Sequence, residues 1–246
     1  MDSYDLVLQG LEYAKKGNVM KENTQKAVEL FEKAIELEPS YARAHAWRAC
    51  TLSNLADWEE SPDPKIFENA FESIQLALEL DSNEPEVHRI MGALKLWHER
   101  DHEMARYHFE KARELCPSDV FIISRYAIML IYFAEFDKAL EELERAKRLD
   151  PFSHDLLFGP EAICHYWLDN PEVALQTFKK VKVKKNFLFY IALANEKSGN
   201  NDKASENLKE AYALTGMDND SFVGSQPFKD QELTSKLKIE LSTITV

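Results

Sequence analysis

One short pattern of alanine and bulky apolar residues occurs six times along this chain of 246 residues. In each copy an alanine is followed four positions later by a bulky apolar residue, and three positions after that by a second small or branched residue. The copies are Ala27/Phe31/Ala34, Ala70/Ile74/Ala77, Ala105/Phe109/Ala112, Ala139/Leu143/Ala146, Ala174/Phe178/Val181 and Ala204/Leu208/Ala211. The first alanines lie 30 to 43 residues apart, and most copies end at a helix-breaking residue. A pattern of this length that recurs six times predicts a repeat protein.

The spacing of each copy predicts one helix, and the residues upstream of it predict a second. Positions i, i+4 and i+7 lie along one stripe of an α-helix, where alanine lets a neighbouring helix approach closely. A small residue stands near the middle of the preceding helical stretch in most units, at Gly10, Ala49, Gly92, Ala127 and Ala192. Each unit is therefore predicted to be a helical hairpin, which buries its apolar stripe by stacking on its neighbours.

The predicted fold class is all-α, an α-solenoid of about six hairpins over residues 1–216. The hairpins are expected at residues 3–39, 40–82, 83–117, 118–151, 152–184 and 185–216. The chain has only 7 glycines, too few for the turns of a β-sandwich or barrel. Residues 217–246 are predicted to form an irregular connection and then an amphipathic helix, with Leu233, Leu237, Leu241 and Ile244 on one side. This helix is expected to cap the apolar end of the sixth hairpin.

The repeat resembles the tetratricopeptide repeat, which has a period of about 34 residues and an A-x3-F…P signature. Four copies contain the strings FEKAIELEP, IQLALELDS, FEKARELCP and LERAKRLDP. The resemblance implies a right-handed superhelix in which the first helix of each hairpin lines the concave face. A narrower resemblance rests on YDLVLQG and AVELFEKAIELEPSYARAHAWRA. These strings are similar to tetratricopeptide modules attached to bacterial class III nucleotide cyclases and to winged-helix regulators.

Three places depart from a regular repeat. The first two hairpins carry insertions, around residues 18–24 and 57–65. The second insertion ends in Asp63 and Pro64, an N-cap followed by proline in the first turn, and so predicts the start of a helix. The fifth hairpin has Gly159 and Pro160 inside its expected first helix, which predicts that this helix starts late or kinks.

The composition argues against several classes of function. The chain has 30 basic and 43 acidic residues, a net charge of −13, which opposes binding to nucleic-acid phosphates. The sequence shows no signal peptide and no apolar stretch long enough to cross a bilayer. Three cysteines at irregular spacing, Cys50, Cys116 and Cys164, indicate a reducing compartment. We therefore predict a cytoplasmic protein with no nucleic-acid partner and no membrane insertion.

No residue pattern predicts catalysis. Histidines crowd the third hairpin, and His98 and His102 have the spacing of a metal-binding pair on one helix. These two histidines are expected to straddle a turn, and no third ligand stands at a suitable spacing. The chain has no phosphate-binding glycine loop and no zinc-hydrolase motif. We predict no catalytic residue, no metal and no cofactor.

The repeat register assigns aromatic and arginine side chains to the groove lined by the first helices. These are Arg43, Trp47, Arg89, Trp97, Phe121, Arg125, Tyr132, Phe158, Tyr166, Phe189 and Tyr190. Such residues are typical of binding hot spots. The alternative for each of them is packing in the core between hairpins. Five lysines between residues 179 and 185 also have two interpretations, a solvated helix end or a docking site for an acidic partner.

The predicted function is a non-enzymatic scaffold or adaptor that binds a protein segment in this groove. Arginines flanked by aromatic rings favour a partner that carries both apolar and acidic side chains. One alternative is a regulatory or sensory module of a bacterial signalling or transcription system, which the narrower resemblance implies. The other is an enzyme built on a helical solenoid.

Overall fold

The computed structural model describes residues 2–17, 20–56, 58, 63–152 and 155–245, and every regular element within these ranges is a helix. Residues 18–19, 57 and 59–62, which belong to the two predicted insertions, lie outside the described residues. The chain divides into two compact units, Met1–Pro117 and Ser118–Val246. Their boundary in the sequence coincides with the predicted boundary between the third and fourth hairpins.

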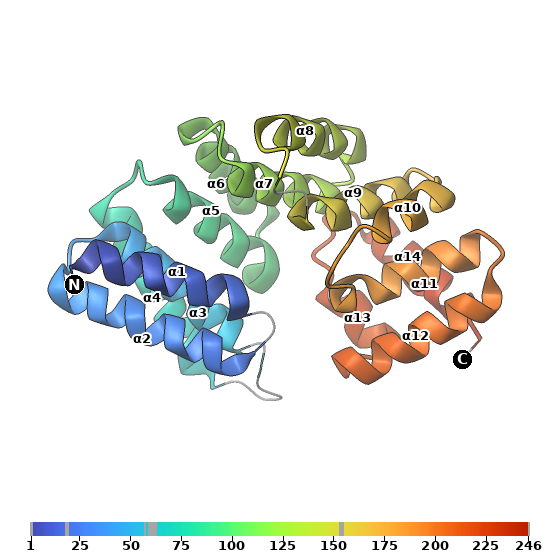
Figure 1. Cartoon of the computed structure of the whole chain (residues 1–246), viewed down its shortest axis with the longest axis horizontal. Helices are drawn as coiled ribbons and strands as arrows, with labels where there is room; N and C mark the ends of the chain where they lie inside the picture. The colour runs from blue at the N-terminus through green and yellow to red at the C-terminus, as the bar shows by residue number, and fades with distance from the viewer. Residues whose placement is uncertain (1, 18–19, 57, 59–62, 153–154, 246) are drawn as a thin grey trace. The chain divides into compact units, whose positions relative to one another are not determined.

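The first unit contains three helical hairpins (Figure 1). Helix α1 (Ser3–Gly17) pairs with α2 (Lys21–Leu37), and α3 (Ala42–Ala56) pairs with α4 (Pro64–Leu80). Helix α5 (Pro85–Leu94), prolonged by a π-helical turn η1 (Lys95–Glu99), pairs with α6 (His102–Leu115). The central residues of the repeated pattern, Phe31, Ile74 and Phe109, are buried, as the periodicity predicts.

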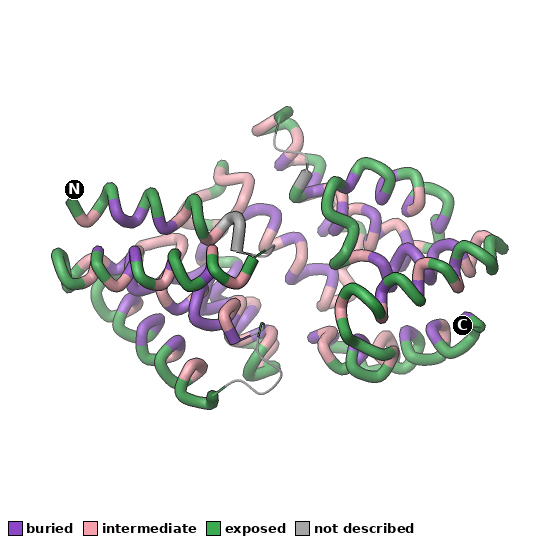
Figure 2. Tube along the Cα trace, turned by 60° about the horizontal axis from the view of Figure 1, so that its bottom comes forward, coloured by how far each residue is buried: buried purple, intermediate pink, exposed green. Residues whose placement is uncertain are grey.

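The second unit contains three more hairpins and a C-terminal pair of helices (Figure 1). The hairpins are α7 (Val120–Tyr132) with α8 (Phe136–Leu149), α9 (Asp155–Trp167) with α10 (Pro171–Phe178), and α11 (Leu188–Lys197) with α12 (Asn201–Thr215). A short 3-10 turn η2 (Lys185–Phe187) precedes α11, and the chain ends with α13 (Asn219–Ser225) and α14 (Gln231–Thr243). Buried residues lie on the sides of the helices that face one another, with exposed residues on the outer sides (Figure 2).

The small residues of the first helices make room for the bulky residues of the second helices. A Cβ added at Gly10 would lie 2.7 Å from the ring of Phe31, and one added at Gly92 would lie 2.9 Å from the ring of Phe109. Both distances are shorter than real Cβ contacts. These two glycines are therefore required by the close approach of the paired helices in the first and third hairpins.

Valine at Gly10 or at Gly92 is therefore expected to lower the free energy of unfolding by about 1–3 kcal/mol, the usual cost of overpacking a core. Urea denaturation followed by circular dichroism measures the change. Gly224→Val is the matched control, because a Cβ there meets no heavy atom within 4 Å. Equal stability losses at Gly92 and Gly224 would contradict the packing explanation.

The structure confirms one predicted helix start and corrects another. The Asp63 carboxylate accepts a hydrogen bond from the backbone N–H of Lys65 at 3.0 Å, and Pro64 opens α4. Helix α9, in contrast, begins at Asp155 and runs through Pro160, so of the two predicted alternatives, a late start or a kink at this proline, the late start is wrong. A Cβ at Gly159 would lie 2.1 Å from the ring of Phe187, so this glycine serves the packing against η2.

The connection between the sixth hairpin and the final helix was predicted to be irregular, and it contains α13. The carboxylate of Asp218 accepts a hydrogen bond from the N–H of Ser221 at 2.8 Å and caps this helix. Phe222 and Val223 of α13 are buried in the core of the second unit. The turn formers around α13 therefore mark its ends and not a continuous loop.

The π-helical turn η1 accommodates one extra residue in the third hairpin. Gly92 and Ala105 are one residue further apart than Ala127 and Ala139, the equivalent residues of the fourth hairpin. An extra residue inside a helix is commonly absorbed as a π-bulge. Both hairpins then turn through a left-handed residue, Arg100 with φ 57° in one and Ala134 with φ 60° in the other. The insertion is thus absorbed before the turn.

Candidate functional site

The C-terminal segment of the chain lies against the first helices of the second unit. We call residues 226–241 the tail segment, and we call the side of α7, α9 and α11 that it contacts the first-helix face. The sequence predicted a helix that caps the end of the sixth hairpin. In the structure, α14 contacts α11 of the sixth hairpin and also α9 of the fifth, and the residues before it contact α7. The first-helix face of this unit is thus occupied by the chain itself.

An aromatic residue anchors the start of the tail segment. The ring of Phe228 packs edge-on against Tyr132 of α7, with centroids 5.2 Å apart, and against Trp167 of α9, 5.4 Å apart. The N–H of Lys229 donates to the carbonyl oxygen of Tyr132 at 2.9 Å, and the Tyr132 hydroxyl donates to Oε1 of Gln226 at 3.3 Å. Apolar packing and hydrogen bonds together fix this part of the tail on α7 and α9.

The carboxylate of Glu240 anchors the C-terminal end of the tail segment. The hydroxyl of Tyr166 donates a hydrogen bond to Glu240, and Nζ of Lys197 lies 3.1 Å from Oε1 of the same carboxylate. Burial raises the pKa of Tyr166, and the charge and hydrogen bond of Glu240 raise it further. The phenol therefore stays protonated and acts as the donor. Lys197 also lies 4.4 Å from the centroid of the Tyr166 ring, so one lysine supports both members of the pair.

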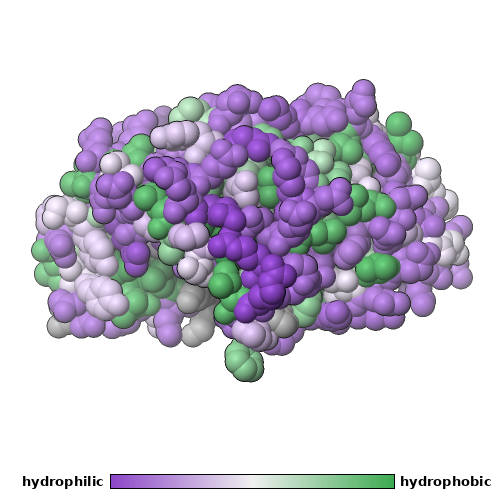
Figure 3. All heavy atoms as spheres, turned by 90° about the horizontal axis from the view of Figure 1, so that it is seen from above, coloured by the Kyte–Doolittle hydropathy of each residue, from purple (hydrophilic) through white to green (hydrophobic). Residues whose placement is uncertain are grey.

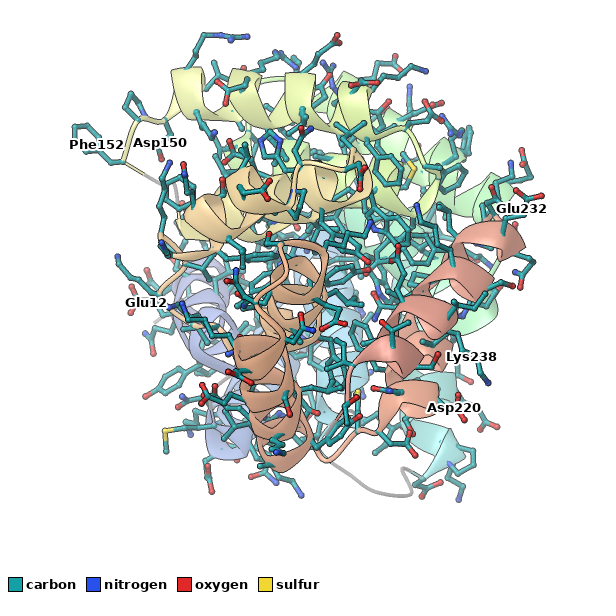
Figure 4. All side chains as sticks on the ribbon, turned by 90° about the vertical axis from the view of Figure 1, so that its right-hand side faces the viewer. Glu12, Asp150, Phe152, Asp220, Glu232 and Lys238 are labelled. Atoms are coloured by element: carbon teal, nitrogen blue, oxygen red, sulfur yellow. The ribbon has the colours of Figure 1, made fainter. Side chains whose placement is uncertain are left out.

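Apolar burial supplies the remaining stabilisation of the tail segment. Phe228, Leu237 and Leu241 are all buried, and each such side chain contributes about 1.5–3 kcal/mol when removed from water. The opposite side of α14 is open to solvent, with Ile239 64% exposed. Lys238 points toward Asp220 of α13 (Figure 4), and the two form an exposed ion pair at 2.8 Å. Helix α14 therefore contacts the first-helix face with one side only.

The predicted groove residues of the second unit have three kinds of surroundings. Tyr132 and Tyr166 contact the tail segment, as described. Phe189 stacks on Phe222 of α13 at 4.0 Å, and Tyr190 meets the same ring edge-on at 5.7 Å. All of these except Tyr132 are buried, so core packing, the alternative raised for the whole set, accounts for them in this conformation.

The other predicted residues of this unit contact cations. The guanidinium of Arg125 lies 4.8 Å from the centroid of the Phe121 ring. The half-buried ring of Phe158 lies 5.3 Å from Nζ of Lys180 and 6.0 Å from Nζ of Lys147. Phe121 and Arg125 therefore form an aromatic and arginine pair on one first helix.

Two residues of the first-helix face, Trp167 and Lys197, were missed in the sequence. Trp167 stands five positions after the buried Ala162 and Lys197 five after the buried Ala192, as Trp97 and Tyr132 stand five after Gly92 and Ala127 in earlier hairpins. The repeat register could have identified them. Their partners Phe228 and Glu240 could not be found in this way, because the tail segment lies outside the repeats.

In the first unit, four predicted residues lie on α3, α5 and η1. Arg89 is buried, lies 4.9 Å from the centroid of the Trp47 ring, and pairs with Glu86 at 2.7 Å. Arg43 is partly exposed and pairs with Glu84 at 3.0 Å. Trp97 lies in η1 and is half-buried. The two arginines already have carboxylate partners, so a ligand carboxylate would compete with these internal ion pairs.

The crowded histidines form contacts within the fold. His98 ends up in η1 and His102 at the start of α6, so they straddle the turn as expected. Within the described ranges, no group of three or more His, Cys, Asp or Glu side chains could hold a metal ion. Nε2 of His88 lies 2.9 Å from the carbonyl oxygen of Ser82 and must donate to it, while Nδ1 lies 3.0 Å from Nδ1 of His108. His88 Nδ1 is therefore the acceptor and His108 the donor between the two rings.

The His88–His108 pair predicts that stability falls in mild acid. Burial and the neighbouring His88 and Lys95 lower the pKa of His108 to about 4, below the value of about 6.5 for an unfolded histidine. The native state thus favours the neutral ring, and the free energy of unfolding is expected to decrease as the pH falls from about 6.5 to about 4. Urea denaturation across this range should show a smaller slope for His108→Gln than for the unchanged chain. Equal slopes would contradict the assignment.

Comparisons with known proteins agree with this architecture. Residues 30–61, which run from the stripe of α2 through α3, match the family model of the tetratricopeptide repeat. No curated protein sequence matches the chain. PilW, a widely conserved type IV pilus biogenesis factor, is 19% identical with a TM-score of 0.61, over 86% of this chain and 92% of its own. PilF of Pseudomonas aeruginosa is 19% identical with a TM-score of 0.57, over 95% and 97%.

A third similar structure is TTC0263, a thermophilic TPR protein of Thermus thermophilus. It is 16% identical with a TM-score of 0.57, over 87% of this chain and 98% of its own. Identities this low show the fold alone. The chain therefore has the all-α fold of tetratricopeptide repeat proteins. No helix within the described part of the chain has both the length and the apolar character needed to cross a bilayer.

Proposed function

We propose that this chain is a non-enzymatic protein-interaction module whose first helices bind protein segments with apolar and acidic side chains. The observation that carries the proposal is the tail segment on the second unit. There the first helices hold a polypeptide by packing on Phe228 and by two contacts to the carboxylate of Glu240. The surface thus has the chemistry to bind a segment of this kind.

The first unit offers related residue types, one of them at an equivalent repeat position. Trp97 corresponds to Tyr132 and Trp167 of the second unit, and Arg43 supplies a cation with a partly exposed side chain. Helix α1 adds Tyr4 and Leu8, both exposed. On the face of the molecule seen in Figure 3, apolar residues are scattered among hydrophilic ones. Aromatic and arginine side chains are the residue types that dominate binding hot spots.

The proposal includes six tetratricopeptide-like repeats within residues 1–216 and a cytoplasmic location, which three free cysteines in the described residues support. The narrower resemblance to modules of bacterial cyclases and transcription regulators remains a hypothesis about the system that uses the chain.

Panning of the full chain against defined peptide libraries tests this function. Libraries of apolar-acidic, apolar-basic and purely acidic peptides are compared, and we expect enrichment from the apolar-acidic library only. Trp97→Ala is expected to weaken binding of the selected peptides by about 2 kcal/mol, roughly 30-fold in affinity. Lys111→Glu on α6 serves as a folded control with unchanged affinity. Enrichment that is independent of apolar and acidic content would reject the proposal.

A further inference from the structure

The residues of the second unit that contact the tail segment come from corresponding places on its three first helices. Each first helix contributes a side chain from near its C-terminal end, Tyr132 from α7, Trp167 from α9 and Lys197 from α11. These three residues occupy the same repeat position, five after the buried alanine of each helix, Ala127, Ala162 and Ala192. A surface built from equivalent positions of successive repeats is suited to an extended or helical ligand.

We propose that the first-helix face of the second unit is a binding surface for a partner helix, and that the tail segment is its displaceable intramolecular occupant. The partner carries an aromatic residue that packs between Tyr132 and Trp167. It continues as a helix with two leucines and one carboxylate on the same side, as Leu237, Leu241 and Glu240 are arranged here. This inference concerns the second unit alone and stands whether or not the first unit binds peptides.

The architecture allows α14 to leave without its neighbour α13. Helix α13 has its own anchors, because Phe222 stacks on Phe189 and the Tyr212 hydroxyl donates to Oδ1 of Asn219 at 2.9 Å. Residues 226–230 join the two helices without regular structure. Helix α14 is held mainly on one side. Release of α14 therefore removes one layer from the face and leaves the hairpins beneath it intact.

The polar anchors determine which partner fits. Lys197 pairs with Glu240 at 3.1 Å and reaches Asp169 at 3.5 Å, where the Asp169 side chain is largely exposed. Once Glu240 leaves, the Tyr166 hydroxyl and Lys197 need a new acceptor in a partly buried place. A partner carboxylate supplies it, whereas a basic or purely apolar helix leaves the Tyr166 hydroxyl unsatisfied and Lys197 with only the exposed carboxylate of Asp169. The surface therefore selects acidic amphipathic helices.

Native-state hydrogen exchange on the unmodified full chain is the first test. The amides of α14 are expected to exchange at least about 100-fold faster than the slowest amides of α11, because α14 opens without global unfolding. Exchange of α14 within about threefold of α11 would make the tail segment part of the cooperative core. That result overturns the proposal.

Binding in trans is the second test. A fluorescent synthetic peptide of residues 226–244 is titrated against the full chain, the Leu237→Asp/Glu240→Lys variant and the milder Glu240→Gln variant. We expect the peptide to bind the double variant at least about 10-fold more tightly, and Glu240→Gln about 3-fold more tightly, than the unchanged chain. A peptide that itself carries both changes should not bind.

Ile239→Asp is the matched control, because it places a charge on the exposed side of the same helix. This variant should bind the peptide as weakly as the unchanged chain does. A folded double variant with no gain over Ile239→Asp overturns the proposal. If the double variant does not fold, the Glu240→Gln titration decides, and no gain in that variant overturns the proposal equally.

Discussion

Replacement of Phe109 by alanine is expected to lower the free energy of unfolding of the first unit by about 3–5 kcal/mol. The ring is buried between α5 and α6, against the backbone of Gly92. A glycine on the facing helix has no side chain that could move into the cavity, so the lost contacts are not recovered. Since domains of this size are stable by only about 5–15 kcal/mol, one substitution removes a large share of the total.

Urea denaturation followed by circular dichroism measures this loss. Met104→Ala, at a partly exposed position of the same helix, is the control and should cost less than about 1 kcal/mol. A loss below about 1.5 kcal/mol for Phe109→Ala would mean that the hairpin collapses around the cavity. The close contact between Gly92 and Phe109 would then not be essential to the repeat.

Replacement of Glu86 by alanine is expected to have a similarly large effect, about 3 kcal/mol or more. The side chain of Arg89 is 4% exposed and that of Glu86 12% exposed, and the two are 2.7 Å apart. Burial alone lowers the pKa of Arg89, but the charge and hydrogen bond of Glu86, together with contributions from Cys50, outweigh this and leave the pKa raised. Without Glu86, the guanidinium stays charged in a buried place beside Trp47, and that desolvation cost falls on the folded state.

A variant that removes both charges separates the cost of losing the ion pair from the cost of leaving the Arg89 charge buried without its partner. Glu86→Leu/Arg89→Met removes both charges and is expected to cost clearly less than Glu86→Ala alone, because no unpaired charge remains buried. Thermal denaturation of Glu86→Leu, Arg89→Met and the double variant provides the cycle. If the stability losses of the two single variants add up to the loss of the double variant, the two residues are not coupled. Strong coupling would assign Arg89 to the fold, and Arg43 and Trp97 would remain for ligand binding in the first unit.

The hairpins could be predicted from the sequence because their determinants are local. The spacing of Ala105, Phe109 and Ala112 defines one helical stripe, and Gly92 defines the facing helix. All of these lie within one hairpin, and the structure packs them together. The Asp63–Pro64 helix start is local in the same way, since a side chain two residues away caps it.

The position of the tail segment could not be predicted in full, for an equally physical reason. The spacing of Leu233, Leu237 and Leu241 shows that a helix has an apolar side, but not which apolar surface it covers. The sequence predicted contact with the sixth hairpin, which α14 makes through α11, but it did not predict the contacts with α9 and α7. The contact with α9, Tyr166 with Glu240, joins residues 74 positions apart. No local pattern reports a pairing over that distance.

The arginines show a further limit of sequence register. The repeat placed Arg43 and Arg89 on first helices correctly, but their carboxylate partners are also at the start of a first helix, at Glu84 and Glu86. The repeat register assigns an arginine to the first-helix side of a hairpin, but it does not show whether a neighbouring carboxylate already pairs with that arginine. Side-chain geometry is needed to separate a structural arginine from one that binds a ligand.

The π-helical turn in the third hairpin has a consequence for how this chain can change in length. Nε2 of His98 lies 2.6 Å from Oγ of Ser53, and its ring lies 4.7 Å from that of Phe67, so the bulge fastens the third hairpin to the second. Loss of a single codon in this stretch would restore an ordinary helix of regular repeat length. The same loss would rotate His98 by about 100° around the helix axis and away from both contacts. Deleting the extra residue would therefore make the sequence more uniform but remove both contacts between the second and third hairpins.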